Sequence, residues 1–571
     1  MKNEKLTELK ETTVWSLYER GRNYHRRVGI YEDTDRNYNF YIGNQWDGAN
    51  LGGVAPVTFN VIKPIIRQKR SVIHDNLYVI NYSSQSYESP SFRKDAERLC
   101  AILNGYASKA WEYNKMDWMG MKITKDAAIN DEGIMFVDFD KEIMLPVCEV
   151  VKKNDIYYGN ENEEIIENQP YILIRKRLDV LQAIDFALSK GLSKDKIDLI
   201  VGDNDNFEES GEAAKDELDE MVTIVYKLYK ENGTVHCSIA TRWVEITKDI
   251  DLRLSIYPVA HFCWEELEGS ARGCGEVRHT IPNQIEINKL LTRRVWTVKD
   301  QAYPIRVANA NKIKNINDLN KVGAVIKTYD QSVQDVKALV STIQPAQMSP
   351  DVKQLEDDLV QLSRELAGSG DVLASVNPEQ ASGRAIIAIQ QQIDAPITEQ
   401  KIGYTNFLED LAKIWLEYLI VHSENGVKLE EKVTDASGQE TVQMINVPQD
   451  ALIKVKASAK IDISPNSPFD KYALETILEN LLTNGFFNIE RLPELETYVK
   501  ALPNDARAPK LVLEGIIEDM KKQQAQIAQI EAQTQIMMQN AEQFVNDDLQ
   551  GQQEQFANAQ RISQQMNNQA M

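Results

Sequence analysis

The sequence predicts a helix-rich α+β protein with more than one domain. Its 571 residues exceed the roughly 250 to 300 at which a single hydrophobic core stops growing. Hydrophobic residues make up 43% of the chain and aromatic residues 8%, which is enough to build real cores. Strand-like alternation occurs within residues 121–246, and long helical periods dominate from residue 281 onward. We therefore expect a mixed α and β body followed by long helices.

The composition excludes several classes of protein. The formal net charge is -22, and affinity for phosphate comes largely from Lys and Arg, so tight binding of a nucleic acid is not expected. No apolar signal-peptide region occurs at the N-terminus, and nowhere do 18 apolar residues run together. We expect no membrane segment and a cytosolic protein. The odd number of scattered cysteines suits free thiols in a reducing compartment: Cys100, Cys148, Cys237, Cys263 and Cys274.

The N-terminal region predicts two helices separated by a turn-rich corner. Residues 2–27 show an amphipathic helical pattern, and turn-prone residues follow near 33–37. In residues 36–48, RNYNFYIGNQWDG, aromatic and polar side chains alternate and end in a Gly/Asn/Asp turn. This alternation predicts a half-buried corner rather than a helix. The next helix is expected to begin after Pro64.

The middle of the chain predicts both helices and strands. Residues 99–113 have a helical period, and residues 121–140 predict a helix, a turn at Asp131-Glu132-Gly133 and a strand. Residues 222–246 predict a hairpin, because Glu231-Asn232-Gly233 separates two runs rich in β-branched and aromatic residues.

The acidic segment 202–220 partly matches a calcium-binding EF-hand loop. Asp203 and Asp205 match the first two ligand positions. The remaining positions do not match, because the loop would need other residues in place of Phe207, Glu208 and Ala214. A solvated acidic loop is the favoured interpretation.

The stretch GCGEVRHTIPNQIEINK, residues 273–289, places a glycine break before a long helical period. We expect one helix over residues 281–303, about 35 Å long at 1.5 Å per residue. Its apolar side chains recur every three or four positions, apart from a gap at Asn288, and should form its buried stripe: Ile281, Ile285, Leu291, Val295, Val298 and Ala302. Its other faces carry Glu286, Lys289, Arg293, Arg294 and Lys299.

A second long helix is expected after a short β-prone insert. Residues 304–348 contain Asn-rich bends and a short β-prone run. Ser349-Pro350-Asp351 then predicts a capped helix start, and the helical pattern continues through residue 366. A loop reaches Ser382, and a further helix extends toward Glu424 with a kink at Pro396.

The C-terminal tail differs in composition from the rest. Residues 521–571 contain sixteen glutamines, with a narrow seven-residue apolar seam that reaches Phe544. A helix of this kind buries too little surface to be stable alone. The seam favours a helix ordered by neighbouring chains, and a disordered Gln-rich tail is the alternative.

The usual signatures of catalysis and metal binding are absent from the sequence. We find no P-loop, no GxSxG, no HExxH and no paired CxxC, so no cofactor is expected. Four possible zinc ligands lie within nineteen residues: His261, Cys263, Cys274 and His279. Their spacing differs from that of structural zinc sites, so buried or hydrogen-bonded side chains are the favoured interpretation.

The order of elements resembles that of the portal protein of tailed double-stranded DNA bacteriophages, the head-tail connector. Four segments carry the resemblance: FYIGNQWDG (40–48) followed by APVTFNVIKPII (55–66), KDAAINDEGIMFVDFD (125–140), the strand, Gly-x-Gly turn and Ile-x-x-Gln-x-x-x-Asn helix of 257–290, and ASGRAIIAIQQQ (381–392). Each segment is weakly specific alone, but their order and spacing are together fairly specific. The resemblance spans most of residues 36–425, and the Gln-rich tail and the acidic segment depart from it.

The resemblance implies a non-enzymatic virion protein that forms a ring, typically of about twelve subunits, at one capsid vertex. Double-stranded DNA is packaged and ejected through such a ring without sequence specificity. The other implied partners are the terminase large subunit, a head-tail adaptor protein, the major capsid protein and in some phages a scaffolding protein, with assembly in the bacterial cytoplasm and no membrane contact. The implied regions are an N-terminal wing (1–280), a stem helix (281–303), a clip (304–348), a second stem helix (349–366), a tunnel loop (367–381), a long kinked helix with a C-terminal wing (382–500) and a crown or barrel (501–571).

The resemblance also suggests site residues of the DNA channel and tunnel loop, and others of the stem. In and beside the tunnel loop these are Gly368, Gly370, Asn377, Glu379, Gln380, Ser382, Gly383 and Arg384. On the stem they are Asn288, Lys289, Arg293 and Lys299. Two other interpretations stay open: a different virion scaffold or connector built on the C-terminal coiled coil, and a zinc-dependent enzyme that uses the His261 to His279 cluster.

Overall fold

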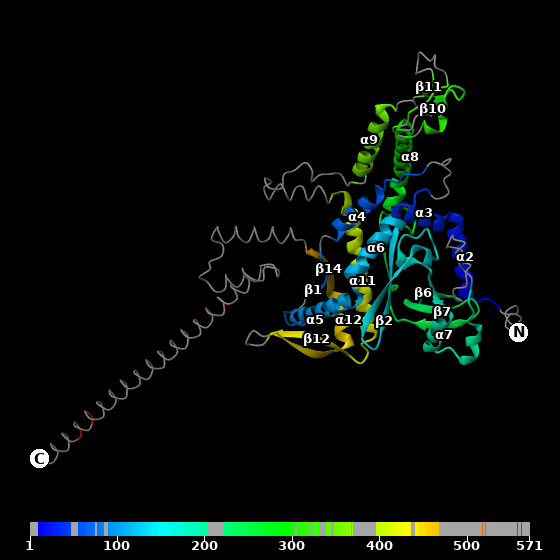
Figure 1. Ribbon diagram of the computed structural model, residues 1–571. Coiled ribbons are helices and arrows are strands. Elements are labelled where there is room, and N and C mark those ends of the chain that lie inside the picture. The colour runs from blue at the N-terminus through cyan, green and yellow to red at the C-terminus, as the bar shows by residue number, and fades with distance from the viewer. Residues whose placement is uncertain are drawn as a thin grey trace, which may run out of the picture. The chain divides into compact units, whose positions relative to one another are not determined.

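In a computed structural model of the chain (Figure 1), the described residues form mainly α-helices, together with five small β-sheets. Residues 1–465 form one compact unit and residues 466–571 a second one. The described residues are 10–46, 55–74, 77–84, 90–203, 221–302, 305–319, 325–329, 339–343, 348–366, 395–434, 440–466 and a few single positions. None of the helices in these ranges is long and apolar enough to cross a membrane.

Three helices begin the described chain: α2 (Thr13–Val28), α3 (Ile30–Ile42) and α4 (Ile62–Ile73). The side chain of Thr12 caps α2 by accepting a hydrogen bond from the Trp15 backbone, so this helix begins eleven residues later than expected. Gly29, with φ of +82°, ends α2 and leads directly into α3.

The helix α3 corrects the expected turn near residues 33–37 and the half-buried corner of 36–48. The alternation of aromatic and polar residues in 36–48 suggested an extended chain. The buried side chains instead follow a helical spacing: Ile30, Tyr31, Asn37, Phe40 and Tyr41. The helix α3 is therefore bounded by Gly29 and Gly43, both of which have positive φ.

Two antiparallel sheets form the centre of the larger unit. One has the order β3-β2-β9, built from β2 (Glu132–Asp140), β3 (Leu145–Val151) and β9 (Val259–Cys263). The other has the order β4-β5-β6-β7-β8, built from β4 (Ile156–Tyr158), β5 (Ile172–Asp179), β6 (Met221–Glu231), β7 (Thr234–Ala240) and β8 (Glu245–Asp251). The predicted hairpin is confirmed, because β6 pairs with β7 across Asn232 and Gly233, both with positive φ.

Further helices and strands complete the larger unit. Of the predicted helix-turn-strand, the helix and the strand are confirmed as α6 (Met116–Asn130) and β2, but the turn is only the single residue Asp131, with φ of +78°, because Glu132 and Gly133 already belong to β2. The other elements are β1 (Leu77–Ser84), α5 (Pro90–Asn114), α7 (Val180–Ser189), α11 (Thr398–Val421), β12 (Val427–Thr434), β13 (Glu440–Val447), α12 (Gln449–Ser458) and β14 (Ala459–Asn466). Most of α11 is buried, including Trp415. Pro396 lies in a short 3₁₀ turn just before α11, and residues 382–394 of the expected kinked helix lie outside the described residues.

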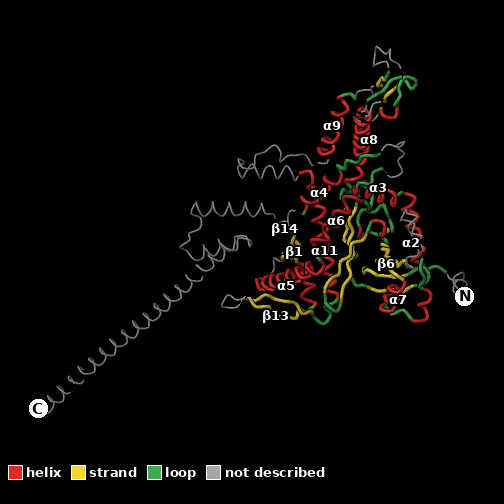
Figure 2. The backbone as a smooth tube through the Cα atoms, in the orientation of Figure 1, coloured by secondary structure: helices red, strands yellow, loops and turns green. Residues whose placement is uncertain are grey.

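Two long helices project side by side from this body. They are α8 (Glu276–Ala302) and α9 (Pro350–Leu366), and the paired strands β10 (Ile305–Ala308) and β11 (Val340–Ile343) lie at their far end (Figure 2). The predicted pair of helices around a small β insert is therefore confirmed. The predicted apolar stripe on α8 is wrong in its outer half, where Val298 is 59% exposed. Closer to the body, the buried face of α8 includes the polar Gln284, Asn288 and Thr292.

Candidate functional site

The start of α8 is fixed by the two glycines of the sequence GCG. A Cβ on Gly273 would lie 2.7 Å from the Glu265 carbonyl oxygen and 2.8 Å from that of Asp131, which leaves no room for a side chain. The Gly275 N–H donates to Oδ1 of Asp131 at 2.7 Å, and Lys153 pairs with the other oxygen of that carboxylate. Glycines are therefore required before α8, because the backbone here packs directly against the end of α6.

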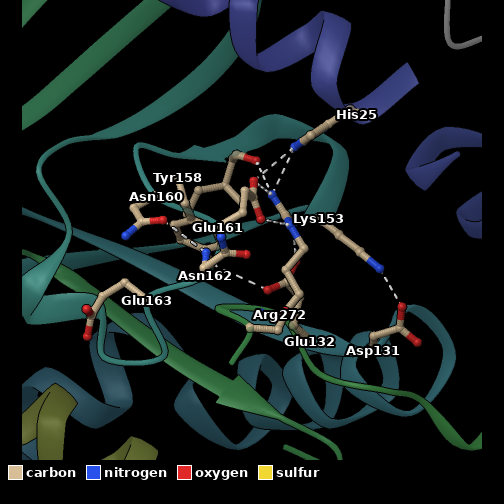
Figure 3. A network of polar contacts seen from close by, with 12 residues as sticks. His25, Asp131, Glu132, Lys153, Tyr158, Asn160, Glu161, Asn162, Glu163 and Arg272 are labelled. Carbon is tan, nitrogen blue, oxygen red and sulfur yellow. Dashed lines mark hydrogen bonds and ion pairs between the residues drawn. The ribbon is translucent and has the colours of Figure 1, made fainter. Parts of the chain in front are cut away.

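A buried network of charged side chains lies beside this break (Figure 3). Arg272, in the loop before α8, bonds Glu132 at the start of β2 and Glu161 in the loop after β4. It also donates to Nε2 of His25 on α2 at 2.9 Å. The guanidinium lies 4.8 Å from the ring centre of Tyr158, a cation–π distance. One side chain thereby joins four segments that are distant in sequence.

The charges of this network are set by burial and by its ion pairs. Burial alone would raise the pKa of Glu132, but Arg272 and His261 outweigh it and lower that pKa to about 2. Burial would lower the pKa of His261, but Cys263 and Glu132 raise it to about 10. For His25, burial dominates and lowers the pKa to about 4. A neutral His25 agrees with the geometry, because its Nε2 accepts a hydrogen bond from Arg272.

The buried polar face of α8 holds an extended segment of the N-terminal region. Three successive turns of the helix present acceptors to alternate backbone N–H groups: Thr292 to Val57, Asn288 to Phe59 and Gln284 to Val61, at 3.1, 3.0 and 2.8 Å. The Gln284 amide also donates to the Phe59 carbonyl at 2.8 Å. These side chains thus satisfy a backbone that has no strand partner in the described structure.

Gln45, from the Gln-Trp segment after α3, joins the same ladder. Its Oε1 accepts from the Asn288 amide, and its Nε2 donates to the Phe40 carbonyl at 2.8 Å. Trp46 donates from Nε1 to the Val57 carbonyl at 3.3 Å. The two segments 40–48 and 257–290, which resembled portal proteins separately, therefore meet at Asn288.

The helices α8 and α9 run antiparallel and are held by polar and apolar contacts. Arg294 on α8 pairs with Glu356 on α9 at 3.0 Å. Nearer the body, Ile287 packs in a small core with Val61 and Ile65, against which Leu359 and Val360 of α9 also pack. A cavity of about 670 Å³ opens between the helices beside Phe59. The helix pair is thus anchored at its root and exposed beyond it.

The four expected stem positions have different surroundings. Asn288 is buried and holds the ladder, so its environment is structural. Lys289 is exposed and pairs with Glu286 on its own helix at 2.7 Å. Arg293 and Lys299 are exposed on α8. The structure therefore does not bring these four side chains together on one face, and their role as stem site residues stays a prediction.

Of the tunnel-loop positions, only Gly368 belongs to the described residues. It has φ of +65°, and a Cβ there would lie 2.4 Å from Cβ of Pro396. Only glycine fits this position without strain. The other seven positions lie outside the described residues: Gly370, Asn377, Glu379, Gln380, Ser382, Gly383 and Arg384. The heptad seam that reaches Phe544 also lies outside the described residues.

The four candidate zinc ligands fall into two separate groups. His261 bonds Glu132 at 2.9 Å and lies near Cys263, whereas Cys274 lies 3.3 Å from Nε2 of His279. Within the described part of the chain, no three His, Cys, Asp or Glu side chains are placed to hold a metal ion. All five cysteines are free thiols, as the sequence predicted, and all except Cys263 are buried.

Sequence reasoning did not identify the ionic network around Arg272. Glu132 and Arg272 are 140 positions apart, so no local spacing could connect them. A signal was nevertheless available, since Glu132 and Arg272 each sit at the edge of a run that becomes buried. Charged residues at such edges need a partner, and the partner has to be sought elsewhere in the chain.

Comparison with known proteins agrees with this arrangement. No curated protein matches the chain. The model of one family, described as the phage P22-like portal protein, matches residues 177–571. The match includes β6 to β9, the Gly273–Gly275 break, both projecting helices and the C-terminal tail. Because it spans more than half of the sequence, the chain belongs to the family of phage P22-like portal proteins.

Proposed function

We propose that this portal protein forms a closed ring of about twelve subunits whose channel carries double-stranded DNA into and out of the capsid. The pair α8 and α9 supports this proposal most directly, because it projects from a large body and carries a small β unit at its end. Such a pair buries only one face in the isolated chain. Neighbouring copies would supply the remaining contacts.

The regions of the chain then have distinct tasks. Helices α8 and α9 form the stem, and the segment between them forms the clip, which docks the terminase large subunit and later the head-tail adaptor. Residues 367–381 form the tunnel loop nearest the DNA. The body contacts the major capsid protein and, where one is used, a scaffolding protein. The ring assembles in the bacterial cytoplasm and ends at one vertex of the virion.

The negative charge of the chain suits a channel that does not bind the DNA passing through it. The chain has 86 Asp and Glu against 64 Lys and Arg, so it carries an excess of the side chains that repel phosphate. Electrostatic forces act over a Debye length of about 8 Å in physiological salt, so only groups on the channel wall influence the DNA. We propose an acidic wall, and a ring with a basic lumen would contradict this part of the proposal.

Imaging and mass measurement of the purified full-length chain test the proposal. We expect negative-stain images of rings with a central hole, and light scattering that gives a multiple of the 65.0 kDa chain near twelve. A coiled-coil scaffold would instead give a small oligomer without a hole. An enzyme that binds zinc would give a monomer or dimer with stoichiometric metal. Either of these results would overturn the portal assignment.

A further inference from the structure

The face of α9 directed away from α8 carries acidic and leucine side chains in one stripe. The stripe steps by four and three residues, which keeps its members on one side of the helix. All five members are exposed, and the last of them also borders the cavity between α8 and α9: Asp351, Leu355, Asp358, Leu362 and Glu365. Leu355 and Leu362 are each about half exposed, at 50% and 49%. An isolated chain therefore leaves two leucines in water among three carboxylates.

The opposite edge of the helix pair has complementary chemistry. The face of α8 directed away from α9 presents Lys289, Arg293 and Trp296, which also step by four and three. Trp296 is 56% exposed. Glu286 and Asp300 border this stripe, and Lys289 already pairs with Glu286. Neither Arg293 nor Asp358 has an ion-pair partner within the described ranges.

The two stripes also stand at matching heights. Because Arg294 bonds Glu356 within the chain, these two residues mark a common level on the antiparallel helices. At 1.5 Å per residue, Arg293 and Asp358 then differ in height by only about 2 Å. Trp296 and Leu355 also differ by about 2 Å. Rotation about an axis that runs along the helices keeps every height unchanged, so copies related by such a rotation bring these levels together.

We propose that the outer stripe of α9 in one subunit packs against the outer stripe of α8 in the next, with Arg293 facing Asp358 and Trp296 facing Leu355. The occupant of each stripe is thus a second copy of this chain, in a head-to-tail contact that closes into a ring. This inference rests on the proposed ring and names the residues that join its subunits. A stem built in this way alternates α8 and α9 around the channel.

Contact between copies explains the two stripes better than contact with DNA. Phosphates would suit Arg293, but they would be repelled by the three carboxylates on the outer face of α9. Half-exposed Leu355, Leu362 and Trp296 gain nothing from a phosphate backbone, whereas an apolar partner removes them from water. Opposite charges on the two stripes also specify which edges meet, because like edges repel.

Two charge-reversal variants of the full-length chain test this contact. In Arg293→Glu each interface places the introduced carboxylate against Asp358, and in Asp358→Arg it places two guanidinium groups together. We expect each variant alone to give at least about tenfold less ring at a fixed concentration, the change that about 1.4 kcal/mol produces. An equal mixture of the two should recover rings, because alternating copies restore an opposite pair at every interface. Lys413→Glu, an exposed reversal on α11, serves as the control and should assemble normally.

Cross-linking tests the same contact independently, in case one of the charge reversals disturbs folding. The double variant Arg293→Cys/Asp358→Cys, treated with a short bis-maleimide, should give covalent multimers, since within one chain these positions lie on opposite edges of the helix pair. Each variant with only one of the two introduced cysteines should stay largely uncross-linked, as should the wild type with its five native thiols. The interface would be overturned by the absence of multimers in the double variant, or by normal rings from both charge reversals. As long as the wild type forms rings, these results would leave the proposed portal function intact. Absence of wild-type rings would instead count against the portal assignment itself.

Discussion

Asn288 on α8 and the backbone of Phe59 are joined by a 3.0 Å hydrogen bond, although they lie 229 positions apart. The bond belongs to a ladder whose spacing has a simple origin. Alternate residues of an extended chain are about 6.6 Å apart, and four residues of a helix rise about 6.0 Å. Positions 57, 59 and 61 can therefore follow positions 292, 288 and 284 without distortion of either segment.

Replacing Asn288 should lower the free energy of unfolding, because its side chain connects α8 to the segment that contains Phe59. Asn288→Leu leaves the Phe59 N–H without its acceptor and removes the bond to Gln45, so we expect a loss of about 1–3 kcal/mol in unfolding free energy. Denaturant unfolding at one fixed protein concentration measures it. Lys299→Leu on the same helix is exposed and should change stability by less than about 0.5 kcal/mol. Equal losses in both variants would contradict the ladder.

The glycine break before α8 predicts opposite effects for two Gly→Ala substitutions. In Gly273→Ala the new methyl group meets backbone oxygens at 2.7 and 2.8 Å, so we expect destabilisation of about 1–3 kcal/mol. In Gly105→Ala, within α5, the nearest atom is 3.9 Å away, so the better helix former should stabilise the protein by about 0.5–1 kcal/mol. Thermal melting distinguishes them, and a gain of stability at Gly273 would show that the break is not tight.

The buried network predicts a large cost when its cation is lost. Arg272→Met leaves the carboxylate of Glu132 buried without its main partner, and we expect a loss of about 3–5 kcal/mol. Lys109→Met is a suitable comparison, because Lys109 and Glu430 form an exposed pair that contributes only about 0–1 kcal/mol. Circular dichroism during denaturation reports both. A small effect at Arg272 would mean that water already reaches the network.

Local patterns predicted the elements that have clear ends. The pair α8 and α9 could be located because Gly273, Gly275 and the Ser349-Pro350 start interrupt the helical periods around them. The β6–β7 hairpin was likewise marked by Asn232-Gly233, which favours the positive φ values found there. In these places the physical cause lies within a few residues of the element.

Local sequence patterns could not predict the polar contacts between residues that are distant in the chain. Gln284, Asn288 and Thr292 are polar, so a search for apolar side chains could not find this buried face of α8. They are buried only because residues 55–61 offer backbone groups to them. The pairing of Arg272 with Glu132 is hidden for the same reason, since nothing near either residue specifies the other. The resemblance located these segments without explaining why they meet.

Acid should destabilise the protein through His25. Its pKa is lowered from 6.5 to about 4 in the folded chain, mainly by burial, so between these values the unfolded state binds more protons. Stability is therefore full above pH 6.5 and falls as the pH drops toward 4, by up to about 3 kcal/mol. His25→Gln, which keeps an acceptor for Arg272, should flatten the stability profile in this range. Parallel profiles for variant and wild type would show that other groups cause the acid sensitivity.

Deletion of residues 371–380 tests the proposed tunnel loop, which lies outside the described residues. The loop is proposed to face the DNA rather than a neighbouring subunit, so its removal should leave ring assembly intact and reduce DNA packaging or retention. Counting rings by negative stain and DNA-filled heads by electron microscopy separates the two effects. Deletion of residues 206–215, ten residues of the acidic segment, is the matched control and should leave both counts unchanged. Heads filled normally without 371–380 would remove the loop from the packaging mechanism, and loss of rings would place it in the subunit contact instead.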